Sequence, residues 1–188
     1  MTKTLVLLFH PDLGRSKANA ALARRAAALP DVEVVGMQET YPEGVDMVRD
    51  GEREAARLLG ADRIVLQFPV QWYSTPPLLK AWQDAVLTRM FYIAYEAEGR
   101  RLEGTPLMIA ATAGNTAEAY RRGGANMFAI SDIFTPLRVT ANRCGLIWTD
   151  PFVLFRADKL SAGEIETAGK NYAAALTNWI ANSGSKKG

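Results

Sequence analysis

The chain has 188 residues, 48% of them hydrophobic and 22% charged, and its formal net charge is +2. This length fits one domain with a sizeable core, expected over residues 1–182 and followed by a polar tail, 183–188. The near-balanced charge gives no basis for a nucleic acid partner. A single cysteine excludes an intrachain disulfide, and the chain begins without a signal-peptide or membrane-anchor pattern, so a cytoplasmic protein is expected.

Strands and helices are expected to alternate along the chain. Short apolar runs predict five strands, the last interrupted at Asp150-Pro151: 4–9, 32–35, 63–68, 106–112, and 144–148 with 152–155. Apolar residues three to four apart, together with alanine-rich runs, predict the helices: 16–29, 52–59, 76–90, 131–142 and 161–179. The alternation predicts a three-layer α/β sandwich whose five-stranded parallel sheet has the flavodoxin-like order 2-1-3-4-5.

Two segments are expected to be irregular. Residues 40–51 contain one proline and two glycines, which disfavour regular structure. Residues 91–105 are first aromatic and then charged, and we interpret them as a long loop, a kind of segment that often carries function. By contrast, Ser161 and Glu164 have the spacing of a capping box, which predicts where the last helix begins.

The loops after the first, third and fourth strands are expected to meet at one edge of the sheet, because these strands are neighbours in the predicted order. In the first loop, Ser16 stands where a helix begins, so its hydroxyl and the first N–H groups can hold a phosphate. Asn19 lies in the first turn, and His10, the sole histidine, ends the strand. The alternatives are that Ser16 is only an N-cap and that His10 only fixes the loop backbone.

The loop after the third strand is rich in aromatic residues, with Trp72 and Tyr73 between the strand and a helix that starts at Pro76-Pro77. Such a loop can offer backbone N–H groups and ring faces to a flat ligand that forms hydrogen bonds. The alternative is that both rings pack on a neighbouring helix.

Several common sites are excluded by their missing motifs. The chain contains no glycine-rich dinucleotide or nucleotide fingerprint and no G-x-S-x-G esterase motif. With one histidine and one cysteine, a metal site built from these ligands is not expected.

Three patterns together resemble a known family. They are His10-Pro11 with Ser16 and Asn19; the run 67–82 with Asp84; and Tyr120 with Gly123-Gly124, Asn126 and Phe128. Over residues 4–179 the chain resembles the flavodoxin-like NAD(P)H:quinone oxidoreductase family. It is most similar to the small bacterial members that include the ancillary subunit of glutathione-regulated potassium efflux. The run 67–82 is the most specific of the three patterns.

The resemblance implies a flavin site. Ser16 and Asn19 would serve the flavin phosphate and ribityl chain, and Tyr120 would hydrogen-bond near the carbonyl where charge develops on reduction. The other residues implied at the cofactor are His10, Pro69, Val70, Gln71, Trp72, Tyr73, Thr112, Gly114 and Asn115. The cofactor would be FMN rather than FAD, as the small size of the relatives suggests. Hydride would pass from NAD(P)H through the flavin to a quinone-like acceptor.

The resemblance also implies a homodimer in which a partner loop roofs the site, with Tyr92 and Tyr95 as candidates for that loop. An alternative function is a flavin-binding regulatory subunit that docks on a membrane transporter. A one-electron carrier is a weaker alternative, because such carriers are usually strongly acidic. Two departures concern substrate choice: Gly114-Asn115 stands where the family has two glycines, and Met90 replaces a glycine.

Overall fold

A parallel sheet forms the centre of the protein, which we describe from a computed structural model over residues 3–184. Its order is β2-β1-β3-β4-β5, and β6 also pairs with β4. The strands are β1 (Thr4–Leu8), β2 (Val32–Gly36), β3 (Arg63–Pro69), β4 (Pro106–Thr112), β5 (Ile147–Trp148) and β6 (Phe152–Leu154). The flavodoxin-like order predicted from the sequence is therefore confirmed, with the fifth position shared by two short strands.

The division of the fifth strand follows from Asp150-Pro151. β5 pairs with the start of β4, and β6 pairs with the end of β4, both in parallel. A proline cannot donate to the ladder, so the strand is interrupted there and resumes afterwards.

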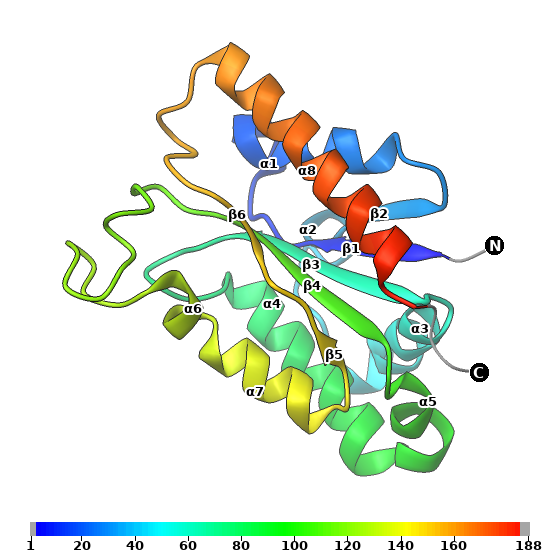
Figure 1. Ribbon diagram of the computed structural model, residues 1–188. Coiled ribbons are helices and arrows are strands. Elements are labelled where there is room, and N and C mark those ends of the chain that lie inside the picture. The colour runs from blue at the N-terminus through cyan, green and yellow to red at the C-terminus, as the bar shows by residue number, and fades with distance from the viewer. Residues whose placement is uncertain (1–2, 185–188) are drawn as a thin grey trace.

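Helices cover both faces of the sheet (Figure 1). On one face lie α1 (Lys17–Ala27) and α8 (Ala162–Asn182). On the other lie α3 (Met47–Leu59), α4 (Pro77–Trp82) and α7 (Thr135–Arg143). Shorter helices are α2 (Met37–Thr40), α5 (Arg100–Leu102) and α6 (Ile130–Ile133). None of the helices within residues 3–184 has the length and apolar character that a membrane crossing requires.

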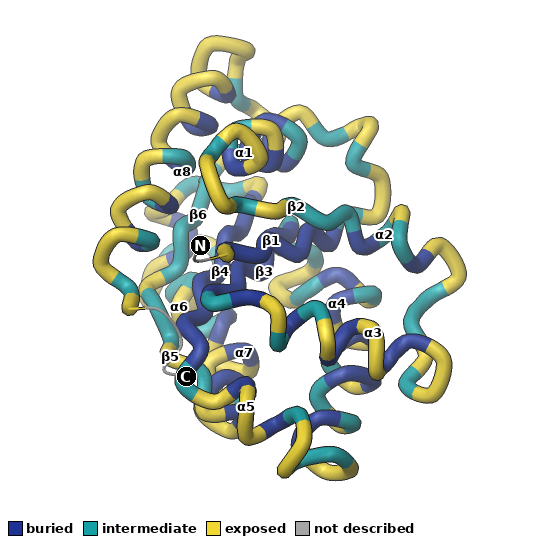
Figure 2. Tube along the Cα trace, turned by 90° about the vertical axis from the view of Figure 1, so that its right-hand side faces the viewer, coloured by how far each residue is buried: buried dark blue, intermediate teal, exposed yellow. Residues whose placement is uncertain are grey.

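Each face of the sheet has its own apolar core. Leu5 and Leu7 point into the core under α3, α4 and α7, whereas Val6 points into the core under α1 and α8. This alternation is the two-residue period of a strand buried on both faces. Figure 2 accordingly shows the central strands as the most continuously buried part of the chain.

The prediction that residues 40–51 are irregular is partly wrong, because α3 begins at Met47. The side chain of Asp46 caps it by accepting hydrogen bonds from the N–H groups of Val48 and Arg49, at 2.9 and 2.8 Å. Gly51 lies inside the helix, where an added β carbon would stand 2.8 Å from Cδ of Arg89. The glycine is thus explained by close packing rather than by a helix end.

The expected long loop 91–105 is also wrong. The chain from Gln83 to Leu102 is helical, in three wide-turned π segments, Gln83–Leu87, Arg89–Ile93 and Tyr95–Gly99, followed by α5. A π turn holds more residues than an α turn, so apolar residues no longer recur every three to four positions. Arg89 closes the segment by pairing with Glu98, with Nη2 to Oε1 at 2.8 Å.

Two smaller expectations are refined. The helix predicted over 131–142 divides into α6 and α7 at Phe134, and Pro136 stands in the first turn of α7, where a missing N–H costs little. In the predicted tail, the carbonyl of Ser183 accepts a hydrogen bond from Arg63 Nη2 at 2.7 Å. Residues 185–188 lie outside the described residues.

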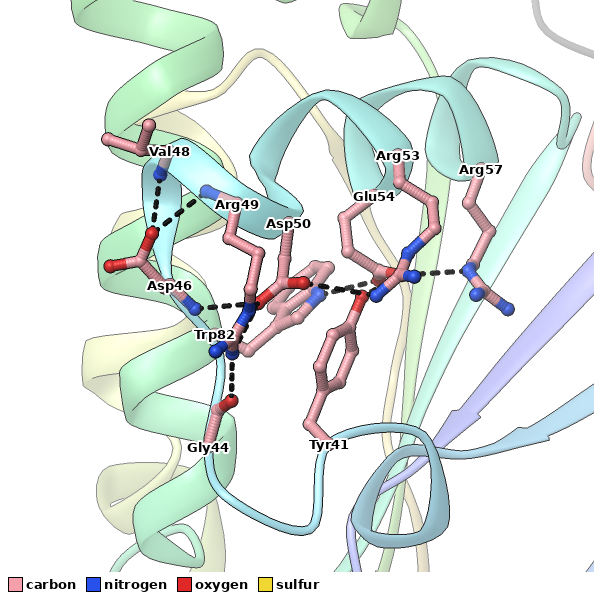
Figure 3. Close-up of polar contacts among 10 residues, drawn as sticks. All are labelled: Tyr41, Gly44, Asp46, Val48, Arg49, Asp50, Arg53, Glu54, Arg57 and Trp82. Atoms are coloured by element: carbon pink, nitrogen blue, oxygen red, sulfur yellow. Dashed lines mark hydrogen bonds and ion pairs between the residues drawn. The ribbon is translucent and has the colours of Figure 1, made fainter.

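A buried carboxylate connects α3 with α4. Glu54 is fully buried and accepts hydrogen bonds from the Tyr41 hydroxyl at 2.6 Å, Trp82 Nε1 at 2.9 Å and Arg57 Nε at 2.9 Å (Figure 3). The Trp82 ring also meets Phe9 edge-on, with centroids 5.7 Å apart. Because α4 follows directly after the aromatic loop, this network fixes the helix that supports that loop.

Candidate functional site

A cleft of about 550 Å³ lies at the carboxyl ends of β1, β3 and β4. Its position is the topological switch point, where ligands bind in open parallel sheets. Of the residues predicted from the sequence, those that line the cleft are His10, Ser16, Asn19, Pro69, Val70, Thr112 and Gly114. The predicted residues that do not line it are Gln71, Trp72, Tyr73, Asn115 and Tyr120.

At one end of the cleft lies the N-terminus of α1. Ser16 Oγ accepts a hydrogen bond from the Asn19 N–H at 3.1 Å, so the serine does act as an N-cap. Its hydroxyl hydrogen stays available, and the N–H groups of Lys17 and Ala18, in the first turn, have no acceptor within the helix. The cleft wall there also includes the side chains of Arg15 and Lys17. Free N–H groups, a hydroxyl and two cationic side chains make this end suited to an anion.

Asn19 is almost fully buried, so its side chain is not free to contact a ligand in the way that the sequence suggested. Its side-chain amide donates a hydrogen bond to Thr112 Oγ1 at 2.9 Å, and its backbone carbonyl accepts a hydrogen bond from Gln67 Nε2 at 3.0 Å. The first turn of α1 is thereby tied to β3 and β4. Asn19 supports the shape of the cleft rather than projecting into it.

His10 holds the loop that follows β1. Its Nδ1 accepts a hydrogen bond from the Asp12 N–H at 3.1 Å, which leaves the proton of the neutral ring on Nε2. Burial lowers the pKa of His10, although the Asp12 carboxylate opposes that shift. The imidazole is therefore neutral at pH 7, and Nε2–H is a donor on the cleft wall. The hydrogen bond to the Asp12 N–H shows that His10 does fix the backbone of the loop.

The aromatic loop is a tight turn closed at both ends. Gln71 N–H donates to the Ser74 carbonyl at 3.0 Å, and Ser74 N–H donates to the Gln71 carbonyl at 2.9 Å. The two central residues, Trp72 and Tyr73, have φ of 46° and 61°. Left-handed backbone at a non-glycine residue costs about 1–2 kcal/mol each, and strain of this kind gathers at functional sites.

The rings of this turn face solvent. Trp72 is 94% exposed and Tyr73 is 52% exposed, which excludes the alternative that Trp72 packs on a neighbouring helix. The Tyr73 hydroxyl donates to Asn126 Oδ1 at 3.5 Å, and this contact connects the turn to the segment that follows β4. A strained turn that exposes a large aromatic ring is poorly explained by stability alone.

Tyr120 lies in that segment and is buried, with its ring 5.8 Å from the ring of Phe155. Burial raises the pKa of Tyr120, and the nearby Tyr73 hydroxyl raises it further. The Tyr120 hydroxyl therefore stays protonated at neutral pH and can donate a hydrogen bond.

The departure at Gly114-Asn115 has a local explanation. Asn115 Oδ1 accepts from the Thr116 N–H at 2.9 Å, so the side chain folds back on its own loop. Its φ is not positive, and the backbone therefore does not require a glycine. Gly114 faces Asp158, because an added β carbon would stand 3.3 Å from Asp158 Oδ1.

The segment after β6 completes the wall, which the sequence analysis did not anticipate. Its contributions are Ala157, Asp158 and Leu160, and the first turns of α8 add Ile165. A usable signal was present: the fifth strand of the predicted order flanks the fourth, so its carboxyl end must also reach this edge of the sheet.

Comparison with known proteins agrees with this geometry. The family model for the flavodoxin-like fold matches residues 2–179. The glutathione-regulated potassium-efflux system ancillary protein KefG of Cronobacter sakazakii is 37% identical over 180 residues, which cover 96% of this chain and 93% of the relative.

Two solved structures are also similar. General stress protein 14 from Treponema denticola, crystallised in complex with FMN, has a TM-score of 0.83 and 30% identity, covering 94% of this chain and 98% of that chain. An NADPH-quinone reductase from P. pentosaceus has a TM-score of 0.78 and 28% identity, covering 94% and 99% of the two chains. The resemblance inferred from the sequence is confirmed, and the chain belongs to the flavodoxin-like fold family.

Proposed function

We propose that the protein is an FMN-dependent NAD(P)H oxidoreductase that reduces quinones or similar acceptors by two-electron transfer. The observation that carries this proposal is one cleft that runs from the N-terminus of α1 to Pro69 and Val70, the residues that lead into the strained aromatic turn. FMN has a phosphate at one end and a flat, hydrogen-bonding ring at the other. The FMN complex and the quinone reductase among the similar structures support the same assignment.

The residues fit FMN in three places. Ser16 and the first N–H groups of α1 would hold the phosphate. Pro69 to Tyr73 would hold the edge of the ring, with Thr112, Gly114 and Asn115 beside it. The protonated hydroxyl of Tyr120 would donate toward the developing charge, since preorganised donors stabilise such charge. FMN, when bound, supplies two-electron chemistry between NAD(P)H and the acceptor. FAD stays the less favoured alternative.

The assembly and location remain predictions from the sequence. Tyr92 is 71% exposed and has the Arg143 guanidinium over its ring, so it is available for a contact between subunits of a homodimer. The Tyr95 hydroxyl donates to Glu103 within the chain at 2.7 Å, which makes it the weaker candidate. A cytoplasmic location is retained on the sequence argument alone.

The visible absorption spectrum of the purified protein, recorded before and after NADPH is added without oxygen, tests the proposal. We expect flavin bands that bleach with NADPH and return when a quinone is added. A colourless protein that cannot be reconstituted with FMN would overturn the assignment. Flavin bands that neither NADPH nor NADH bleaches would rule out the oxidoreductase while keeping the cofactor.

The similarity to KefG favours a second candidate, a flavin-binding subunit that regulates a membrane transporter. The two functions differ in what they require. Capture of a potassium-efflux transporter from membranes by the tagged protein would support the regulatory role. Rapid quinone reduction with no such capture would exclude it.

A further inference from the structure

The segment between β6 and α8 (Figure 1) is held rigidly against the segment that follows β4. Arg156 N–H donates to the Asn115 carbonyl at 3.0 Å, and Ala157 N–H donates to the Ala113 carbonyl at 3.0 Å. Lys159 N–H then closes a turn onto the Arg156 carbonyl at 2.8 Å. Asp158 stands inside this turn, so its place is fixed by backbone hydrogen bonds on both sides.

These contacts point the Asp158 carboxylate at Gly114. An added β carbon on Gly114 would stand 3.3 Å from Oδ1, and both residues line the cleft. Across residues 3–184, no side chain forms an ion pair with this carboxylate and no group donates a hydrogen bond to it. Asp158 is exposed and lines the cleft, so this wall of the cleft carries a carboxylate without a salt-bridge partner among residues 3–184.

We propose that Asp158 sets the reduction potential of the bound cofactor, by disfavouring the negative charge that FMN gains when it is reduced. The inference rests on the proposed function, which places the ring beside Gly114. Hydride from NAD(P)H brings two electrons and one proton and leaves NAD(P)⁺. The reduced ring thus carries one more negative charge than the oxidised ring until a second proton arrives from solvent.

The sign of the effect follows from Coulomb repulsion. A carboxylate beside the ring would weaken binding of the more negative, reduced form relative to the oxidised form. A lower potential makes the reduced protein a stronger donor to acceptors, which suits a reductase of quinones. Asp12, the other acidic residue on the wall, lies at the phosphate end and already accepts from the Arg15 N–H at 3.3 Å.

The test compares Asp158→Asn with Asp150→Asn, which makes the same chemical change at an exposed position outside the cleft. The readouts are the midpoint potential of bound FMN and its dissociation constant in the oxidised state. We expect Asp158→Asn to favour reduced over oxidised FMN by about fivefold or more, a potential about 20 mV higher for a two-electron couple. Asp150→Asn should leave the potential unchanged.

Asp158→Glu separates charge from shape, because it keeps the carboxylate, and its potential should stay near that of the wild type. Equal potentials for the two Asn variants, with FMN bound and reduced by NADPH in both, would overturn the inference and leave the proposed function intact. Failure of the wild-type protein to bind FMN would overturn both.

Discussion

The side-chain amide of Asn19 donates a hydrogen bond to Thr112 Oγ1 at 2.9 Å, although 93 residues separate them in the sequence. The contact joins the first turn of α1, where we propose that the phosphate binds, to the last residue of β4. The first turn of α1 and the end of β4 are therefore held together by a buried hydrogen bond. Changes at this contact should affect the fold and the cofactor together.

Asn19→Ala should lower the free energy of unfolding by about 1–3 kcal/mol, because it leaves Thr112 Oγ1 without its hydrogen-bond donor and creates a small buried cavity. Urea denaturation measures this loss. Thr112→Ser, which keeps the hydroxyl, is the matched control and should change stability by less. We expect FMN retention to fall in Asn19→Ala. An Asn19→Ala protein as stable as the wild type would mean that the hydrogen bond is unimportant.

Ser16→Ala tests the phosphate end of the cleft. Loss of the N-cap should cost about 1 kcal/mol of stability. Loss of a hydrogen bond to a charged phosphate should weaken FMN binding by a further 1–2 kcal/mol, roughly five- to thirtyfold in dissociation constant.

Ser161→Ala provides a matched control, because Ser161 caps α8 in the same way, with Glu164 N–H to Ser161 Oγ at 3.3 Å, and does not line the cleft. Its stability should fall by a similar amount while FMN affinity is unchanged. Equal FMN affinity in both variants would show that Ser16 serves only as a helix cap and does not bind the phosphate.

The layered fold could be predicted because the buried strands are largely apolar runs that alternate with helical segments along the chain. Thr4–Leu8 and Pro106–Thr112 show this most clearly, since every residue in both is buried. The helical segment from Phe91 to Leu102 could not be predicted, because its wide turns remove the three-to-four spacing that identifies an α-helix. The start of α3 was missed because Pro42, Gly44 and Gly51 indicated an irregular segment, although Asp46 is a typical N-cap residue.

The site could be predicted only in part, for a topological reason. Loops after β1, β3 and β4 meet because these strands are neighbours, and this brought Ser16, Val70 and Gly114 to one cleft as expected. Asp158 was missed because residues 155–160, between β6 and α8, carry no motif typical of a binding site. The orientation of Asn19 is set by hydrogen bonds between distant residues, which no local pattern records.

Trp72 offers a test of strain in the aromatic turn. Trp72→Gly removes a side chain that is 94% exposed and relieves a left-handed backbone at φ 46°. Trp72→Ala removes the same ring but keeps the strain. We expect the glycine variant to be more stable than the alanine variant by about 1 kcal/mol, measured by thermal or urea unfolding. If the alanine variant were as stable as the glycine variant, or more stable, the turn would not be strained.

Glu54 offers a test of the network that supports α4. Glu54→Gln places an amide among three donors, from Tyr41, Arg57 and Trp82, and removes the charge that faces the guanidinium. We expect a loss of about 3 kcal/mol in the free energy of unfolding, as for other buried pairs from which one partner is removed. Glu52→Gln, an exposed change in the same helix, should stay within about 0.5 kcal/mol. Similar values for the two variants would contradict the role assigned to Glu54.

His10 gives the stability a pH dependence. Burial lowers its pKa in the folded state, so below about pH 6.5 the unfolded chain binds a proton that the folded protein does not. The stability is fully present above that pH and falls as the pH drops toward the lowered pKa. His10→Asn keeps an acceptor for the Asp12 N–H but cannot take up the proton. Unfolding curves at about pH 7.5 and about pH 5.5 should therefore differ more for the wild type than for the variant. The same difference in both proteins would show that groups other than His10 govern the stability in this pH range.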